Sequence, residues 1–260
     1  MRKNRWVLVA GLAVVRMLVA AVDSFARSLS ELMENGTPAR IEAVFKAGAN
    51  VETRVKDGAT PLMIAAGFNR NPEVVSVLLK AGAKLEDQAK GNVTPLMYAA
   101  FNQNPAVVSA LLKAGSKLEA REKDGETPLM IAAGFNPNPK VISVLLKAGA
   151  ELDARDNEGM TPLMYAAFNQ NPTVISDLVK AGANLYAQDR SGMTPLMWTA
   201  PCDQNRVVIS ILLKAGATGK LKSGEGKTAY DYAQLNRSLK GTSQVNELRS
   251  AAPTVEHGAA

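Results

Sequence analysis

Apolar positions in this chain recur as pairs of short helical stretches. In "TPLMIAAGFNRNPEVVSVLLKAG", which begins at Thr60, the second stretch places Val75, Leu78 and Leu79 at i, i+3 and i+4. That spacing puts one apolar face on an α-helix. Each stretch starts at Thr-Pro or Asn-Pro, and Thr or Asn caps a helix while proline is tolerated at its first position. The pattern therefore predicts pairs of short helices, each pair ending at a Gly that serves as a left-handed cap.

These pairs form repeats. Thr-Pro recurs every 33 or 34 residues at Thr60, Thr94, Thr127, Thr161 and Thr194, and Thr228 holds the same place in "GKTAYDYA". A period of this length indicates a stacked array. A second period of 67 residues is superimposed, because odd repeats read "AAGFN-NP" and even repeats read "YAAFNQNP". We interpret this as duplication of a two-repeat block, with the extra residue of the odd repeats lying between the two helices.

Stacking also predicts the domain organisation. A repeat this small cannot bury its apolar face alone, and the end repeats need more polar outer faces. We expect an N-terminal capping repeat at residues 27–56, five full repeats at 57–220, a C-terminal capping repeat at 221–250 and a disordered tail at 251–260.

The repeats resemble the ankyrin repeat family. The resemblance is carried by "DGATPLMIAA" followed by "VVSVLLKAGAKLE" and by "DNEGMTPLMYAA" followed by "VISDLVKAGANLY", and it extends from Phe25 to Ser250. It implies an all-α ankyrin-repeat solenoid of stacked helix–turn–helix units with projecting turns and a curved groove. It also implies that the chain binds proteins.

The chain departs from the family pattern after "TPL", where His is usual. Met stands there instead, at Met63, Met97, Met130, Met164 and Met197. Met removes a hydrogen-bonding side chain and supplies a flexible apolar one, so we interpret these residues as packing between repeats. The following residue alternates as Ile64, Tyr98, Ile131, Tyr165 and Trp198. Core filling is our interpretation of these side chains, and an aromatic stripe facing a ligand is the alternative.

The resemblance implies binding through the turn tips and the first helix of each repeat. The corresponding tip residues are Lys56, Asp57, Ala59, Lys90, Val93, Lys123, Asp124, Glu126, Asn157, Glu158, Met160, Arg190, Ser191 and Met193. Past the first helices, the same surface would include Phe68, Phe101, Phe135 and Phe168. We expect Val93, Met160 and Met193 to be exposed, and exposed apolar strips mark interaction sites. Met160→Asp with Met193→Asp should then abolish binding without changing stability. The four Phe are either aromatic anchors or covers for the helix junction.

Composition argues against catalysis, metals and nucleic acid. The chain has one Cys, Cys202, and one His, His257, which cannot build a His-based triad or a His/Cys zinc site. "SGEGKT" at residues 223–228 lacks the first glycine of a phosphate loop and aligns with the repeat. The net charge of +6 falls to +3 without residues 1–26, because 26 basic and 23 acidic residues remain. Six lysines lie at helix C-termini, where the helix dipole favours them. We therefore expect no enzyme, no cofactor, no metal and no nucleic-acid partner.

Residues 1–26 have the layout of a secretory signal peptide. A basic start precedes an apolar stretch from Trp6 to Val15, and small residues allow cleavage after Ala21 or Ala26. Arg16 interrupts the apolar stretch, so a membrane anchor and initiation at Met17 are the alternatives.

We expect a monomeric, periplasmic or secreted protein that binds an unidentified protein partner, without membrane insertion after cleavage. The alternatives are a constitutive scaffold or stabilising partner of a cell-envelope enzyme, and a small-molecule or catalytic role at Cys202 or "GEGKT". Inner-membrane anchoring or a cytoplasmic location would follow from the other interpretations of the N-terminus.

Overall fold

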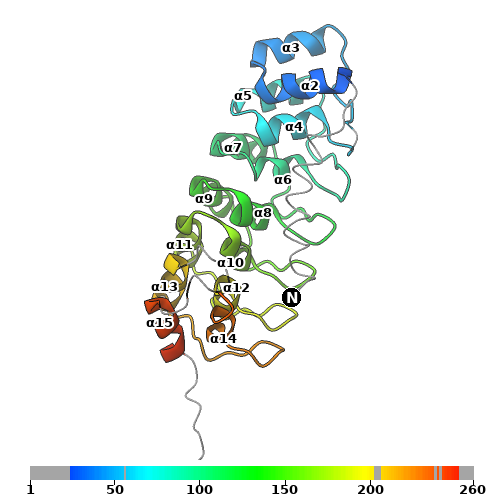
Figure 1. The fold of residues 1–260 in the computed structure, drawn as a ribbon. Coiled ribbons are helices and arrows are strands. Elements are labelled where there is room, and N and C mark those ends of the chain that lie inside the picture. Colours follow the sequence, from blue (N-terminus) through cyan, green and yellow to red (C-terminus); the bar gives the residue numbers. More distant parts are fainter. Residues whose placement is uncertain (1–23, 56, 202–205, 237–238, 240–241, 252–260) are drawn as a thin grey trace, which may run out of the picture. The chain divides into compact units, whose positions relative to one another are not determined.

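The computed structural model describes residues 24–55, 57–201, 206–236, 239 and 242–251. Helices dominate these residues, which contain no β-strand and a single isolated bridge between Ala89 and Val93. The all-α expectation is thus confirmed (Figure 1). The proposed signal peptide, apart from its last three residues, and the tail beyond Ala251 lie outside the described residues, as do Lys56, Cys202 and His257.

Each repeat contributes one helix to each of two layers. The first helices are α2 (Ser24–Asn35), α4 (Pro61–Phe68), α6 (Pro95–Ala99), α8 (Pro128–Phe135), α10 (Pro162–Tyr165) continued by the 3₁₀ helix η1 (Ala166–Phe168), α12 (Pro195–Thr199) and α14 (Ala229–Ala233). The second helices are α3 (Pro38–Lys46), α5 (Glu73–Lys80), α7 (Pro105–Lys113), α9 (Pro139–Lys147), α11 (Pro172–Lys180), α13 (Arg206–Lys214) and α15 (Ser243–Ala251).

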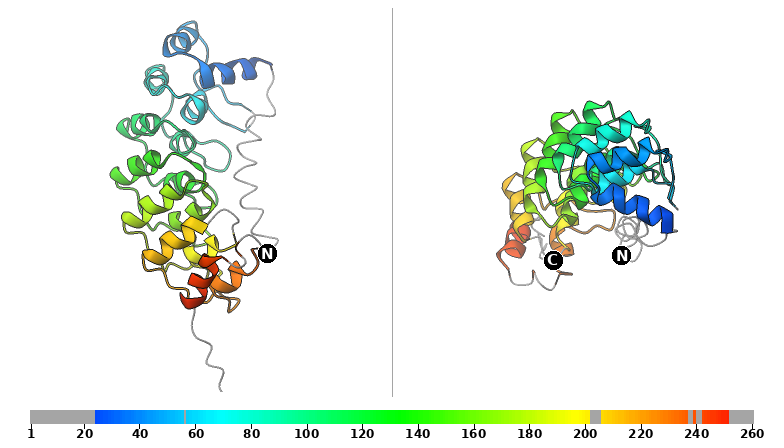
Figure 2. Two further views of the ribbon diagram at one scale, coloured as in Figure 1. Left: turned by 60° about the vertical axis from the view of Figure 1, so that its left-hand side comes forward. Right: turned by 90° about the horizontal axis from the view of Figure 1, so that it is seen from above.

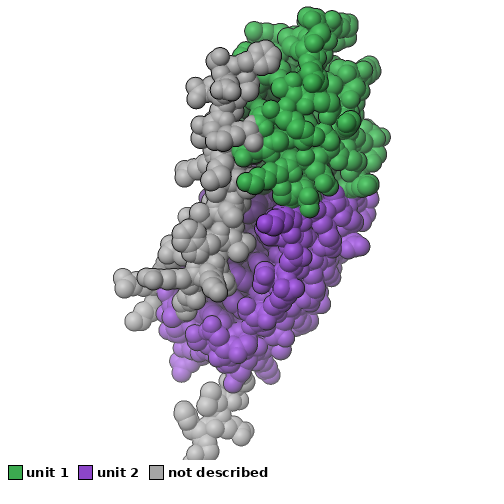
Figure 3. Space-filling model, turned by 90° about the vertical axis from the view of Figure 1, so that its right-hand side faces the viewer, with its two compact units in different colours: residues 1–102, 106–117 green, residues 103–105, 118–260 purple. Residues whose placement is uncertain are grey.

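The chain divides into two compact units (Figure 3). Unit 1 comprises residues 1–102 and 106–117, and unit 2 comprises residues 103–105 and 118–260. Within unit 1, α2, α4 and α6 pack side by side in one layer, and α3 packs on α5 in the other. Within unit 2, α8, α10, α12 and α14 follow one another in one layer, and α9, α11, α13 and α15 follow in the other. Figure 2 shows both layers from two further directions.

Most of the caps expected from sequence are present. The Thr hydroxyl that precedes α4, α6, α8 and α12 accepts the backbone N–H of the third helical residue at 3.3–3.4 Å. Asn138 and Asn171 cap α9 and α11 by accepting the backbone N–H of the second helical residue, Lys140 or Thr173. The glycines after α5, α7, α9, α11 and α13 have φ between 94° and 101°, the left-handed conformation of a helix C-cap. In α10 the Met164 N–H donates to the Thr161 carbonyl instead, so the Thr161 hydroxyl is buried without a partner among the described residues.

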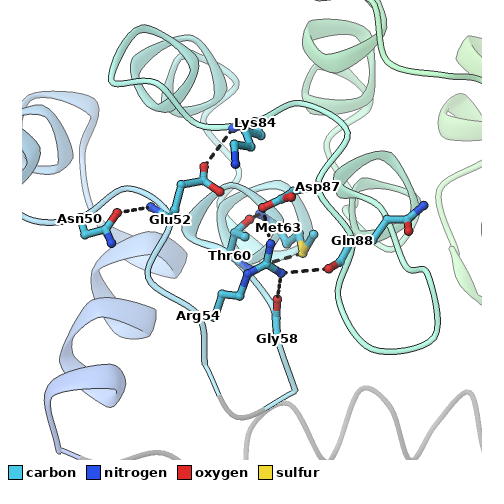
Figure 4. Close-up of polar contacts among 9 residues, drawn as sticks. All are labelled: Asn50, Glu52, Arg54, Gly58, Thr60, Met63, Lys84, Asp87 and Gln88. Carbon is cyan, nitrogen blue, oxygen red and sulfur yellow. Dashed lines mark hydrogen bonds and ion pairs between the residues drawn. The ribbon is translucent and has the colours of Figure 1, made fainter.

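The Met after "TPL" has two functions in the fold. All five side chains are at most 1% exposed, which fits packing between repeats. In four of them the sulfur also lies 3.4 Å from the backbone nitrogen of the capping Thr, as between Met63 and Thr60 (Figure 4). In a capping box, the side chain of the third helical residue accepts the backbone N–H of the capping residue. The Met sulfur, a weak acceptor, takes that place here. The prediction of packing between repeats thus agrees with the burial, and the contact from sulfur to the Thr nitrogen adds a weak polar interaction that was not predicted.

The extra residue of the odd repeats does not lie between the helices. It is Gly67 or Gly134, inside the first helix, and α4 and α8 accordingly have eight residues, one more than the four of α10 and the three of η1 together. This corrects the interpretation from sequence.

Buried asparagine side chains connect consecutive first helices. The Asn102 amide donates to the carbonyl oxygens of Ala66 and Asn69, both at 2.8 Å. In unit 2, Asn169 repeats this contact with Ala133 and Asn136, again at 2.8 Å. The amide thereby supplies a hydrogen-bond donor to carbonyls at the end of the preceding helix, where the helix itself offers none. These asparagines therefore set the spacing of neighbouring repeats.

A second set of polar contacts holds the long connectors. Arg54 donates to the carbonyl oxygens of Gly58 at 2.8 Å, in its own turn, and of Gln88 at 2.9 Å, in the next connector (Figure 4). The Glu52 carboxylate accepts the Lys84 N–H at 3.0 Å. In unit 2, Arg121 and Arg155 make the equivalent pairs of carbonyl contacts, and Gln188 substitutes for Arg in the next repeat. The connectors are thus fixed before any partner binds.

Candidate binding surface on the turns and first helices

The turn tips need a glycine that no other residue could replace without strain. Gly125 has φ 86°, and a Cβ there would lie 2.8 Å from the Asn157 side chain. Gly192 has φ 72°, and its Cβ would lie 2.8 Å from the backbone nitrogen of Gly224. Positive φ is costly for a side-chain-bearing residue, and each turn also lies close against the next. These glycines therefore allow consecutive turns to pack edge to edge.

Backbone hydrogen bonds connect neighbouring turns. In unit 2 the N–H groups of Asn157, Arg190 and Gly224 donate to the carbonyl oxygens of Asp124, Glu158 and Ser191 at 2.8–2.9 Å. In unit 1 the Lys90 N–H donates to the Asp57 carbonyl at 3.0 Å. Because these contacts use main-chain atoms, side chains at the turn tips can be substituted without loss of the hydrogen bonds between turns. We call the hydrogen-bonded turns of unit 2 (residues 122–126, 156–160, 189–193 and 223–227) the turn edge.

The tip residues expected from sequence fall into three groups. Those that are exposed are Lys90, Lys123, Asp124, Asn157, Glu158, Arg190 and Ser191. Those that are half-buried are Asp57, Val93 and Glu126. Those that are buried are Ala59 at 0%, Met160 at 7% and Met193 at 8% exposure. The expectation that Met160 and Met193 are exposed was wrong, and Val93 is only partly exposed.

Turn geometry explains the burial. The Met160 N–H donates to the Asp156 side chain at 2.8 Å, and the Met160 carbonyl accepts the Asp156 N–H at 3.1 Å. Met193 makes the same two contacts with Asp189. The residue before the capping Thr is therefore at the base of the turn, against the first helix. Sequence alignment with a family pattern places it in the turn but does not show on which side.

The exposure of the four Phe lies between what exposed aromatic anchors and buried covers of the helix junction would show. Phe68 is 37% exposed, and Phe101, Phe135 and Phe168 are half-buried. Phe168 meets the Trp198 ring edge-on with centroids 5.5 Å apart. None of the four is fully buried, and Phe168 packs on the aromatic residue of the next repeat. Ile64, Tyr98, Ile131 and Tyr165 are buried at 4–5% exposure, which favours core filling over an aromatic stripe.

The first side chain of three turns in the turn edge pairs with an aromatic side chain of the following first helix, and sequence reasoning missed these pairs. The Asp189 carboxylate accepts the Trp198 indole N–H at 2.9 Å, and the Asp156 carboxylate accepts the Tyr165 hydroxyl at 2.6 Å. In the last repeat Ser223 and the Tyr232 hydroxyl are 2.9 Å apart. The signal was present, since each pair is nine residues apart. It is a polar residue at the start of a turn, followed by an aromatic in the first helix.

Glu126, at the base of one turn, has a raised pKa. The pKa of Glu126 is raised to about 7, mainly by burial and further by the neighbouring Glu122, Asp156 and Asp124 carboxylates, while the hydrogen bond from Tyr165 opposes the shift. Burial, together with the Glu126 charge, also raises the pKa of Tyr165. The pKa of Glu122 is also raised by burial, and hydrogen bonds from backbone N–H groups oppose this shift.

Other chemistry has little support in this part of the chain. The described residues contain no group of three His, Cys, Asp or Glu side chains arranged to hold a metal ion. "SGEGKT" is the turn of the last repeat, in which the Ser223 N–H donates to the Lys227 carbonyl and Lys227 pairs with Glu225 at 2.8 Å. None of the helices described here is of the length and apolar character that crossing a bilayer requires.

Comparison with known proteins gives a consistent picture. A family model described as ankyrin repeats (3 copies) matches residues 18–122 and 116–189, and one described as ankyrin repeats (many copies) matches residues 178–233. No curated protein matches the chain. Among solved structures, the human ASB11 ankyrin repeat domain is 24% identical, with a TM-score of 0.73 over 86% of this chain and 96% of that one. The ankyrin repeat domain of Bcl-3, a member of the IκB protein family, is 27% identical, with a TM-score of 0.65 over 85% of this chain and 97% of that one.

Proposed function

Because the chain belongs to the ankyrin repeat family, whose members are generally protein–protein interaction modules, we propose that it binds a partner protein through its turn edge and first helices, without catalysis. Binding here means equilibrium recognition by a preformed surface. The named relatives support the fold and the general kind of function, and they do not identify the partner.

The observation that carries the proposal is the hydrogen-bonded turn edge of unit 2. Main-chain contacts of 2.8–2.9 Å fix each turn against the next, while Lys123, Glu158 and Arg190 project from it exposed. A surface ordered before binding loses little conformational entropy on binding, and this raises affinity. Acidic and basic tips alternate along the edge, so its charges favour a partner with a complementary mixed pattern over a uniformly charged one.

The half-buried Phe add apolar area beside these charges. Phe135 and Phe168 are the last residues of α8 and η1 in two consecutive repeats of unit 2, and each is half-buried. Aromatic side chains at the centre of an interface, surrounded by polar groups, supply most of the binding energy in many complexes. We therefore place the apolar centre of the interface at these Phe and its polar rim at the turn edge.

We further propose that the protein is exported and acts in the periplasm or outside the cell. The support is the basic and apolar layout of residues 1–26. Cleavage after Ala21 would leave α2 intact, whereas cleavage after Ala26 would remove its first three residues. Ala21 is therefore the better candidate. Intact mass of the protein from native fractions tests this, and an uncleaved N-terminus would favour a membrane-anchored or cytoplasmic location.

A pull-down experiment tests the binding site. We expect Lys123→Ala, Glu158→Ala and Arg190→Ala combined to reduce partner capture at least about tenfold, because they remove exposed tip side chains and leave the main-chain edge intact. The matched control is Lys147→Ala, Lys180→Ala and Lys214→Ala, on exposed positions at the ends of α9, α11 and α13. Equal capture by both triple variants would contradict the proposed site.

The alternative is a constitutive scaffold or stabilising partner of a cell-envelope enzyme. It differs in predicting one stoichiometric protein that co-purifies from every preparation, and loss of that enzyme when this chain is absent. A partner captured only transiently would favour the module over the scaffold.

A further inference from the structure

The contacts around Tyr165 need more hydrogen atoms than the hydroxyl supplies. Its oxygen lies 2.9 Å from Glu126 Oε1 and 2.6 Å from Asp156 Oδ2. A phenol carries one hydrogen and can donate it to one acceptor. Two ionised carboxylates would therefore leave one short, buried oxygen–oxygen contact without a hydrogen. One of the two carboxyl groups must be protonated for both contacts to be hydrogen bonds.

Of the two carboxyl groups, that of Asp156 has the hydrogen bonds that stabilise a negative charge. Its other oxygen accepts the backbone N–H groups of Glu158 at 2.9 Å and Met160 at 2.8 Å. Hydrogen bonds of this kind stabilise the charged form of a carboxyl group. Within the described part of the chain, the hydrogen bond of the Glu126 side chain is the one to Tyr165. The additional hydrogen therefore belongs on Glu126.

The charges around Glu126 favour the same assignment. Acidic groups face it from its own turn, Glu122 and Asp124, and from the next turn, Asp156. The nearby guanidinium of Arg121 is bound to the carbonyl oxygens of Gly125 at 2.9 Å and Arg155 at 2.6 Å. Arg155 is likewise bound to the carbonyls of Gly159 and Gln188, and Lys123 is exposed to solvent. Burial raises the pKa of Glu126 most, the hydrogen bond from Tyr165 lowers it, and the three carboxylates raise it, which brings it to about 7, within the physiological range.

We propose that Glu126, Tyr165 and Asp156 form a proton-linked switch between two consecutive turns of unit 2. In the closed state the Glu126 carboxyl donates to the Tyr165 oxygen, and the Tyr165 hydroxyl donates to the Asp156 carboxylate. As pH rises the Glu126 proton passes to solvent, and two carboxylates then face one hydroxyl. Their repulsion loosens the turn at residues 122–126 from the turn at residues 156–160.

The helix that carries Tyr165 is the irregular one. α10 has four residues and continues as the 3₁₀ helix η1, and the hydroxyl of its capping Thr161 is buried without a partner. A 3₁₀ turn is common at the end of a helix, but the missing hydroxyl cap distinguishes α10 from α4, α6, α8 and α12. Tyr165 is therefore held by two acidic groups on a first helix that is less well capped than its neighbours.

The sign of the pH effect follows from the raised pKa. An ordinary Glu titrates near 4.5 in the unfolded chain, and Glu126 titrates near 7 when folded. The folded protein then binds more protons than the unfolded one between these values, and stability falls as pH rises through that window. The stabilising contribution is fully present below about 4.5 and lost above about 7.

Thermal unfolding of the full chain between pH 5 and 8.5 tests the switch. Glu126→Gln keeps the shape and can donate to Tyr165 without titrating. We expect its unfolding temperature, relative to the native chain, to rise by several degrees across this range and to level off above pH 7.5. Glu158→Gln, on an exposed residue of the neighbouring turn, is the control and should show no such trend. A difference between Glu126→Gln and the native chain that does not change with pH would overturn the proposal.

Asp156→Asn gives a second test that does not rely on stability. It removes the competing acceptor, so Tyr165 is free to donate to Glu126, and the Glu126 carboxyl should titrate at lower pH. Carbon-13 NMR of the Glu126 carboxyl measures this directly in both proteins. An ordinary Glu titration in the native chain, or no shift in Asp156→Asn, would overturn the proposal.

An effect of the switch on partner capture rests on the proposed function, because Glu126 belongs to the turn edge. The proton measurements do not depend on a partner. A native chain with the switch but no pH-dependent capture would count against the binding site and leave the switch intact.

Discussion

Gly134 lies directly against the Tyr165 ring of the following repeat. A Cβ built on Gly134 would be 3.4 Å from Tyr165 Cδ1 and 3.6 Å from Tyr165 Cβ. Gly67 has the same relation to Tyr98 within unit 1, with 3.4 Å to Cδ1. The bulky residue of an even repeat thus packs on the smallest residue of the odd repeat before it. This complementarity gives a physical reason for the 67-residue period, because the two-repeat block is the packing unit.

Large substitutions at Gly134 should therefore destabilise unit 2. We expect Gly134→Leu to cost about 1–3 kcal/mol, because overpacking forces the Tyr165 ring or the helix backbone to shift. Gly134→Ala should lie within about 1 kcal/mol of the native chain, since a methyl group just fits and alanine favours the helix. Urea unfolding of both variants measures this. A Leu variant as stable as the Ala variant would show that the glycine is not needed for packing.

Met160→Asp should be destabilising, contrary to the expectation from sequence. The side chain is 7% exposed at the base of its turn, next to the Asp156 carboxylate. Burying an unpaired charge there should cost about 2–4 kcal/mol. Met160→Leu is the control and should cost less than about 1.5 kcal/mol, because it nearly conserves volume. Thermal unfolding that leaves Met160→Asp unchanged would mean that the turn opens readily, and binding data from this variant would then be interpretable.

Asn169→Ala should weaken the contact between two consecutive first helices. The amide donates to the carbonyls of Ala133 and Asn136 at 2.8 Å, and the substitution removes this donor from both buried carbonyls. We expect a loss of about 2–4 kcal/mol in the free energy of unfolding. Gln170→Ala, on the adjacent exposed residue, should be neutral. Amide hydrogen exchange should show the loss of protection first in α8 and η1, and uniform loss across unit 2 would contradict a local role.

The repeat architecture could be predicted from local signals. Thr60, Thr94, Thr127 and Thr194 cap helices because Thr-Pro is a nearest-neighbour signal, and the Gly caps follow from a backbone conformation that glycine adopts freely. Regular spacing then predicted stacking, since one pair of short helices cannot bury its apolar face. The fold and the general binding function followed from these signals together with the family resemblance.

Exposure of particular turn residues could not be predicted in the same way. Met160 and Met193 stand in turns that read as solvent-facing, yet main-chain pairing with Asp156 and Asp189 places them at the base. The exposure of the four Phe residues could not be predicted either, since Phe68 is 37% exposed and the other three are half-buried. Which side of a turn a residue occupies depends on the hydrogen bonds that close the loop. The periodic sequence pattern does not predict these hydrogen bonds.

By itself, the amino-acid sequence determined the helix pairs, their caps, the period and the family, because each of these depends on residues close together in the chain. Only the tertiary structure decided that the sulfur of Met63 contacts the Thr60 nitrogen, that Gly134 accommodates Tyr165, and that Glu126 and Asp156 share one hydroxyl. The last two relationships join residues about 30 to 40 positions apart, in the same range as the repeat period. They arise when the turns and first helices of consecutive repeats are stacked, and stacking brings into contact groups whose chemistry neither repeat shows alone.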